Sequence, residues 1–231
     1  MLRLLGFFVL AMLLASLLGH LPVVGVVFRS TGVFGILIAS ALLAALFTRI
    51  GERLLLARRS AAQIRALSAV DSAHNQGKVG ALHLAGGRAR KAVPFLEAAV
   101  RGEPGVAEWH YRLGQAHLAL GARESALREL EQCTEIDGEH AYGSAMRARA
   151  AVLIELGRPE EALGVLDEVE RNHGPSAESA YRRGRALRTM GRKEGARAAF
   201  GEAMRLASQA TRYQRVEAGR WALRARLARI W

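Results

Sequence analysis

The sequence is almost free of cysteine, and its N-terminal part is almost free of charged residues. Its 231 residues include one cysteine, Cys133, so no disulfide can form within the chain and no oxidising compartment is implied. The first 50 residues carry only three formal charges, at Arg3, Arg29 and Arg49, although the whole chain has a net charge of +12. This shift in composition places the first domain boundary near Gly51.

Two charge-free apolar runs fill the N-terminal segment. The first is LLGFFVLAMLLASLL from Leu4, and the second is GVFGILIASALLAALF from Gly32. A bilayer core requires about 20 apolar residues per helix, so we expect a transmembrane helical hairpin. The predicted membrane module covers residues 1–50, with spans at about 4–20 or 4–28 and at 32–50. The alternative is a cleaved signal peptide, since Met1-Leu2-Arg3 gives a positive start.

Arginines gather behind the second run. Four of them, Arg49, Arg53, Arg58 and Arg59, stand against the single acid Glu52 in this region, whereas the connection between the runs offers only Arg29. Because cytoplasmic flanks are enriched in Lys and Arg, we expect a multi-pass protein of the bacterial inner membrane with both termini in the cytoplasm. Residues 51–72 are predicted to form a basic stalk helix, and the four arginines to contact anionic lipid head groups. Ordinary stop-transfer charge would give the same topology.

A ten-residue pattern recurs four times in the remainder of the chain. The stretches LAGGRARKAV, LALGARESAL, IELGRPEEAL and RTMGRKEGAR align without gaps. Their shared alanines, Ala92, Ala126, Ala162 and Ala196, are 34, 36 and 34 residues apart, a period typical of a helical solenoid. The shared glycine is expected to end the first helix of each unit in a left-handed conformation. Pro159, in the third copy only, suits a helix start.

Two further columns of the repeat indicate how each helix pair packs. A small residue recurs on the first helix and a large one on the second, so that small is expected to face large. The small column is Gly80, Gly114, Ala150 and Gly184, and the large column is Leu96, Leu130, Leu166 and Phe200.

These columns closely resemble the tetratricopeptide repeat family, whose pattern of an aromatic, Leu-Gly, Ala and Pro is best met by residues 108–140. The resemblance implies an all-α fold, in which the transmembrane hairpin is followed by an α-solenoid of about four helix pairs and a C-terminal capping helix. The solenoid is expected at 73–210, with units at about 73–106, 107–140, 143–176 and 177–210. A two-residue insertion falls near Ala141-Tyr142.

The repeat stops after Ala210, and residues 211–231 are strongly basic. Five apolar residues share one face of this segment, namely Tyr213, Val216, Leu223, Leu227 and Ile230. We expect a capping helix, and caps of solenoids have a polar outer side. A basic amphipathic helix lying on a membrane or holding a partner is the alternative.

No catalytic, metal-binding or cofactor-binding constellation is evident in the sequence. His83 and His117 occupy one repeat column and Cys133 a column of small residues, so all three are expected to be packing residues. The glycine-rich stretch from Gly77 to Gly87 lacks the preceding strand and the spacing of a phosphate loop. We therefore expect no catalytic residue, no metal ion and no cofactor, and the chain is not predicted to be an enzyme.

The arginines of the first helices favour a binding role. The resemblance implies that the first helices of successive units line a concave groove that binds a peptide. The expected groove residues are Lys78, Tyr111, Arg112, Gln115, Arg147, Tyr181, Arg182, Arg185 and Arg188. Arginine binds carboxylates bidentately, so the expected ligand is an acidic segment or an acidic C-terminus. A generally basic surface without a specific ligand is the alternative.

Together these features predict a membrane-anchored adaptor, scaffold or assembly factor that binds a protein partner through the concave face of its repeats. The layout of two short spans, an Arg-rich stalk and helical repeats also resembles HemY-type bacterial inner-membrane proteins. The alternative function is an integral accessory subunit of a larger membrane complex, with the transmembrane helices as the interface. Nucleic acid is not an expected partner, because the tethered domain has no groove-reading motif.

Overall fold

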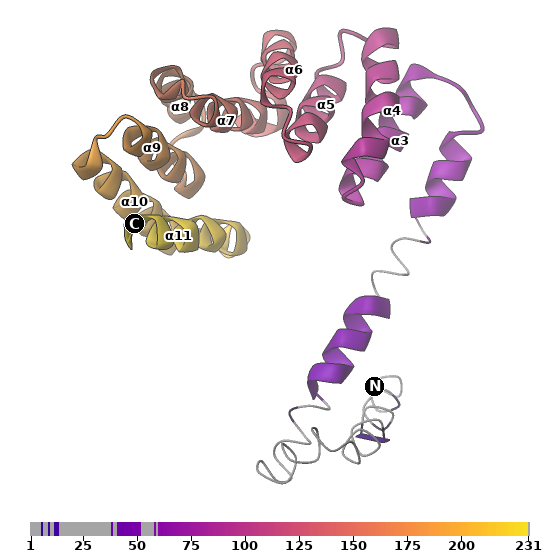
Figure 1. Ribbon diagram of the computed structural model, residues 1–231, viewed down its shortest axis with the longest axis horizontal. Coiled ribbons are helices and arrows are strands. Elements are labelled where there is room, and N and C mark those ends of the chain that lie inside the picture. The colour runs from indigo at the N-terminus through magenta and orange to yellow at the C-terminus, as the bar shows by residue number, and fades with distance from the viewer. Residues whose placement is uncertain are drawn as a thin grey trace. The chain divides into compact units, whose positions relative to one another are not determined.

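The computed structural model describes residues 41–51 and 60–230, together with six single positions, Gly6, Val9, Met12, Leu13, Ile38 and Arg58. The chain divides into two compact units, Met1–Gln63 and Ile64–Trp231 (Figure 1). Most of the predicted first span, most of the first half of the second, and the proposed lipid contacts Arg53 and Arg59 lie outside the described residues.

Two segments of the described N-terminal part are helical, residues 41–51 and 60–67. Within the part of the chain that the structure describes, no helix is both long enough and apolar enough to cross a membrane. The helix that includes residues 60–67 ends short of the predicted stalk limit at residue 72. The physical reason is that Ser72 adopts an extended conformation and caps the next helix, its Oγ accepting a hydrogen bond from the Asn75 N–H at 3.2 Å.

The second unit is a chain of α-helices, and the described residues contain no strand. The helices are α3 (Ala73–Ala85), α4 (Ala89–Gly102), α5 (Ala107–Ala119), α6 (Arg123–Ile136), α7 (His140–Glu155), α8 (Pro159–His173), α9 (Ala177–Thr189), α10 (Lys193–Ser208) and α11 (Arg215–Ile230). Each helix packs against the next one, as Figure 1 shows. This order gives four helix pairs, α3–α4, α5–α6, α7–α8 and α9–α10, followed by α11.

The turn within each pair has the predicted chemistry. Gly87, Gly121, Gly157 and Gly191 have φ values of 69°, 79°, 74° and 74°, a region that residues with a Cβ rarely adopt. Pro159 lies at the start of α8, where its missing N–H leaves no helical hydrogen bond unmade. The prediction that these glycines end the first helices is confirmed.

Small residues face large ones across the helix pairs, as the columns predict. A Cβ placed on Gly80 would lie 2.6 Å from Leu96 Cγ, and one on Gly184 would lie 2.5 Å from Phe200 Cε1. Each glycine therefore lies where a large side chain of the second helix fills the space. The same close approach recurs at Gly114 and Leu130, where the distance is 3.0 Å.

The first helices lie on the inner side of the stack. Among the described helices, α3 contacts α5, α5 contacts α7, α7 contacts α9 and α9 contacts α11, whereas α4, α6, α8 and α10 make no such contacts with one another. The first helices of neighbouring units are therefore closer to one another than the second helices are, as on the inner side of a curved stack. The first helices therefore line the inner face.

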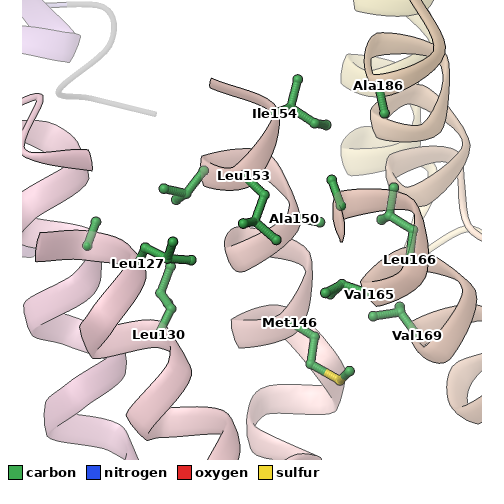
Figure 2. Packing of buried hydrophobic residues seen from close by; sticks show 13 residues of the cluster. Leu127, Leu130, Met146, Ala150, Leu153, Ile154, Val165, Leu166, Val169 and Ala186 are labelled. Carbon is green, nitrogen blue, oxygen red and sulfur yellow. The ribbon is translucent and has the colours of Figure 1, made fainter. Parts of the chain in front are cut away.

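A continuous core runs through the middle of the stack. Leu130 of α6, Leu153 of α7 and Leu166 of α8 are buried together with Ala186 of α9 (Figure 2). Cys133 is also fully buried, which confirms its prediction as a core residue. Burial raises the pKa of its thiol to about 12, so the reactive thiolate is scarce at neutral pH.

The two-residue insertion adopts an unusual backbone at the start of α7. Ala141, Tyr142 and Gly143 have φ values of 50°, 54° and 72°. A left-handed conformation costs about 1–2 kcal/mol for a residue with a Cβ, so Ala141 and Tyr142 need support. Arg147 supplies it, because its guanidinium donates to the Tyr142 carbonyl at 2.9 Å.

The last helix is oriented differently from the expected cap. Its face with Ala225 is buried against the preceding helices, whereas Val216, Leu223, Leu227 and Ile230 are exposed. The outer side of α11 therefore carries these four apolar side chains beside exposed arginines, where a wholly polar surface was expected. The side of α11 that packs against α9 and α10 consists of alanines and one tryptophan. The larger aliphatic residues therefore lie on the opposite, exposed side.

Candidate functional site

Three side chains from two first helices form an arginine cluster, which we define as Arg147, Glu178 and Arg182. Arg147 Nε of α7 donates to Glu178 Oε2 of α9 at 3.1 Å, and Arg182 donates to the other oxygen of the same carboxylate. Arg182 also donates to the Arg147 carbonyl. The structure thus joins two predicted groove residues that are 35 positions apart in the sequence.

The arginine cluster holds more positive than negative charge. Its side chains are 13–16% exposed, and two guanidinium groups share one carboxylate. Burial lowers the pKa of Arg182, attraction to Glu178 opposes that effect, and repulsion from Arg147 and Arg185 adds to it. Because an arginine remains protonated at neutral pH, a net positive charge is held at low exposure.

Aromatic rings cover the arginine cluster. The Trp221 ring of α11 lies 5.3 Å from the Arg182 guanidinium carbon and 5.5 Å from the Tyr181 ring. Tyr181 in turn lies 5.8 Å from Phe200. A guanidinium over an indole face is attracted to it, so α11 helps to fix the position of Arg182.

A cavity of about 420 Å³ opens beside the arginine cluster. It lies among the start of α7, the loop before α9, the end of α10, and α11. Its walls include Tyr142, Arg147, His173, Glu178 and Trp221. A site of this size accepts a small number of side chains, and both charge and aromatic surface are available in it.

A second group of predicted residues lies on α5. Arg112 Nε donates to Glu108 Oε1 at 2.6 Å, and Gln115 accepts from Arg112 at 3.5 Å. The other Glu108 oxygen lies 2.9 Å from His140 Nε2. Tyr111 packs edge-on against His140 at 5.3 Å between ring centroids. Here the carboxylate meets one arginine only.

The remaining predicted residues are distributed over three places. Arg185 is half-buried on α9 and forms no ion pair among the described residues. Arg188 donates to the Ala228 carbonyl of α11 at 3.3 Å. Lys78 is exposed on α3. The proposed lipid contacts Arg49 and Arg58 are exposed and belong to the first unit.

The repeat pattern does not assign Trp221 to the site. It lies beyond Ala210, where the repeat pattern stops, so no column could assign it to the inner face. Glu178 lies on the same helix as Arg182, but its pairing with Arg147 of the preceding unit carries no sequence signal. Among the described residues, no group of three or more His, Cys, Asp or Glu side chains could hold a metal ion.

Comparison with known proteins supports the repeat architecture. Two family models described as tetratricopeptide repeats match residues 83–150 and 147–211. No curated protein matches the sequence.

Solved structures share the fold at low sequence identity. A crystal structure of MamA protein is 18% identical with a TM-score of 0.61, over 71% of this chain and 92% of that one. The tetratricopeptide repeat protein TTC0263 of Thermus thermophilus is 21% identical with a TM-score of 0.53, over 76% and 96%. YrrB, described as having an unusual peptide-binding site, is 17% identical with a TM-score of 0.50, over 67% and 86%. Residues 83–211, more than half of the chain, therefore belong to the tetratricopeptide repeat family, whose members are generally non-enzymatic scaffolds for protein–protein interaction.

Proposed function

We propose that this chain is a membrane-anchored adaptor that binds an acidic protein segment through the inner face of its repeats. The observation that carries the proposal is the arginine cluster, in which Arg147 and Arg182 share only Glu178. A carboxylate from a ligand would bring the charges closer to balance. Arginine suits such a ligand because its planar guanidinium can bind a carboxylate bidentately.

The cavity gives such a carboxylate a place to bind. Arg147 and Glu178 lie in its wall, and Trp221 adds an aromatic surface for the aliphatic part of a ligand. The Nε of Arg182 is buried without a hydrogen-bond partner, so the donors of this residue are incompletely used. Arg185 lies one helical turn beyond Arg182 and extends the positive surface along α9.

Neutralising a groove arginine is expected to weaken binding of an acidic peptide. The probe is a fluorescently labelled oligo-glutamate peptide with a free C-terminal carboxylate, titrated with the chain in detergent. For Arg185→Gln and for Arg147→Gln we expect the dissociation constant to rise by about tenfold, because a hydrogen bond to a charged group contributes about 1.5–3 kcal/mol. Fluorescence anisotropy measures the change.

The control removes the same charge elsewhere. Arg197 is exposed on α10, outside the inner face, so Arg197→Gln should leave the dissociation constant nearly unchanged. An oligo-glutamine peptide of equal length should bind weakly to every variant. Equal losses for Arg197→Gln and Arg185→Gln would contradict a specific site and support the generally basic surface instead.

The membrane anchor rests on the two charge-free N-terminal runs and the arginines behind them. We expect a fluorescent protein fused after Trp231 to be active in the cytoplasm, and alkaline phosphatase at the same position to be inactive. A phosphatase inserted after Ser30, between the two runs, should be active. Phosphatase activity at Trp231, or none at Ser30, would refute the proposed topology.

A further inference from the structure

The helix α11 presents an apolar stripe to the surface. The stripe is defined as Val216, Leu223, Leu227 and Ile230, whose side chains are 72%, 59%, 54% and 72% exposed. Their spacing of seven, four and three residues places them on one side of the helix. Burying aliphatic side chains of this size is favourable, so an apolar stripe left more than half exposed needs an explanation.

The inner side of α11 is already in use and fixes the orientation of the stripe. Ala225 is fully buried, and Ala228 packs against the core that contains Phe200. Trp221 contacts Tyr181 and Arg182 of α9. If α11 rotated to turn its aliphatic residues inward, these contacts with α9 and α10 would be lost.

Arginines border the apolar stripe along its length. Arg220 and Arg224 lie on one side of it and Arg226 on the other, and all three are exposed. The Arg224 guanidinium lies 4.6 Å from the centre of the Trp221 ring. Among the described residues, no arginine of α11 forms an ion pair, whereas Arg112, Arg147 and Arg183 on preceding helices each have a carboxylate partner. The only acidic residue of α11 is Glu217.

We propose that α11 lies along an anionic lipid surface, with the apolar stripe buried at the level of the acyl chains and the flanking arginines among the head groups. The stripe is a convex ridge on one helix, a form that fits a plane and offers no groove for a peptide. Basic residues on both edges match a surface whose negative charge is distributed on every side. The aliphatic stems of the arginines add apolar contact while their guanidinium groups reach the phosphates.

This surface is distinct from the peptide site, although Trp221 connects the two through the opposite side of α11. Binding to lipid would therefore hold the inner face of the repeats at a fixed orientation to the membrane. Binding of α11 to lipid does not depend on the first unit, so it is expected even if the proposed membrane anchor is absent.

The test measures whether the apolar stripe enters lipid in the full chain. A polarity-sensitive fluorophore is attached to Leu227→Cys, and the matched site is Ala198→Cys, which is exposed on α10. The native Cys133 is buried with a raised pKa and should resist labelling. The labelled chain is reconstituted into vesicles of phosphatidylcholine alone, or of equal parts phosphatidylcholine and phosphatidylglycerol.

For Leu227→Cys in the mixed vesicles, we expect a blue shift of the emission, quenching by a lipid-attached nitroxide and loss of quenching by aqueous iodide. All three effects should be small in phosphatidylcholine alone and absent at Ala198→Cys. The double variant Arg220→Gln/Arg226→Gln should lose them, whereas Arg101→Gln/Arg197→Gln, which removes equal charge from α4 and α10, should keep them.

Three outcomes would overturn the proposal. A label at Leu227→Cys that remains open to iodide in the mixed vesicles shows that the stripe does not enter lipid. A blue shift that depends on protein concentration and not on lipid assigns the stripe to another protein chain. A shift that is equal in both vesicle types and insensitive to the arginines excludes recognition of anionic lipid.

Discussion

Replacing Phe200 by alanine is expected to lower the free energy of unfolding by about 3–5 kcal/mol, the range found for removing a buried aromatic ring. Phe200 is 1% exposed and fills the space above Gly184, where even a Cβ would lie within 2.5 Å of the ring. Its ring also contacts Tyr181 and lies under the Arg188 guanidinium at 5.7 Å. Its removal leaves a cavity that the glycine cannot fill.

Urea unfolding followed by circular dichroism measures the loss. Because each unit of a solenoid contacts mainly its neighbours, hydrogen exchange should accelerate in α9, α10 and α11 more than in α3 and α4. Ala198→Ser, an exposed change on the same helix, is the control and should be nearly neutral. A loss below about 1 kcal/mol for Phe200→Ala would show that the α9–α10 pair does not depend on this ring.

Removing the charge of Glu178 is expected to have two opposite effects. Glu178→Gln should lower the free energy of unfolding by about 3 kcal/mol, because Arg147 and Arg182 would keep their charges at low exposure without a counter-ion. The same change should tighten binding of the oligo-glutamate peptide, because it removes the carboxylate that competes with the ligand. Chemical unfolding and fluorescence anisotropy measure the two effects separately.

The chain contains a matched control for this prediction. Glu108 and Arg112 occupy the same repeat positions as Glu178 and Arg182, but their side chains are 35% and 37% exposed. An exposed pair contributes at most about 1 kcal/mol, so Glu108→Gln should change stability little. If Glu178→Gln weakened peptide binding, its carboxylate would not be a competitor of the ligand, and the proposed role of the arginine cluster would fail.

These equivalent pairs show how far the sequence could predict the site. Repeat position placed Arg112 and Arg182 on the inner helices, and the structure has them on α5 and α9. Repeat position could not show that Arg182 is more buried than Arg112, because this difference in burial arises from neighbours outside the repeat unit. Arg182 is covered by Arg147 from the preceding unit and by Trp221 from α11, whereas Arg112 pairs with one carboxylate at the surface.

The helix pairs, their turns and the packing of small against large residues within each unit can be predicted from the amino-acid sequence alone. These features depend on local rules, since glycine permits a left-handed turn and a missing Cβ permits a close approach. The folded arrangement of the units, in contrast, sets which arginines share a carboxylate and which side of α11 faces outward. Both choices depend on contacts between units, and the periodic pattern carries no information about them where it is interrupted at Ala141-Tyr142 or ends after Ala210.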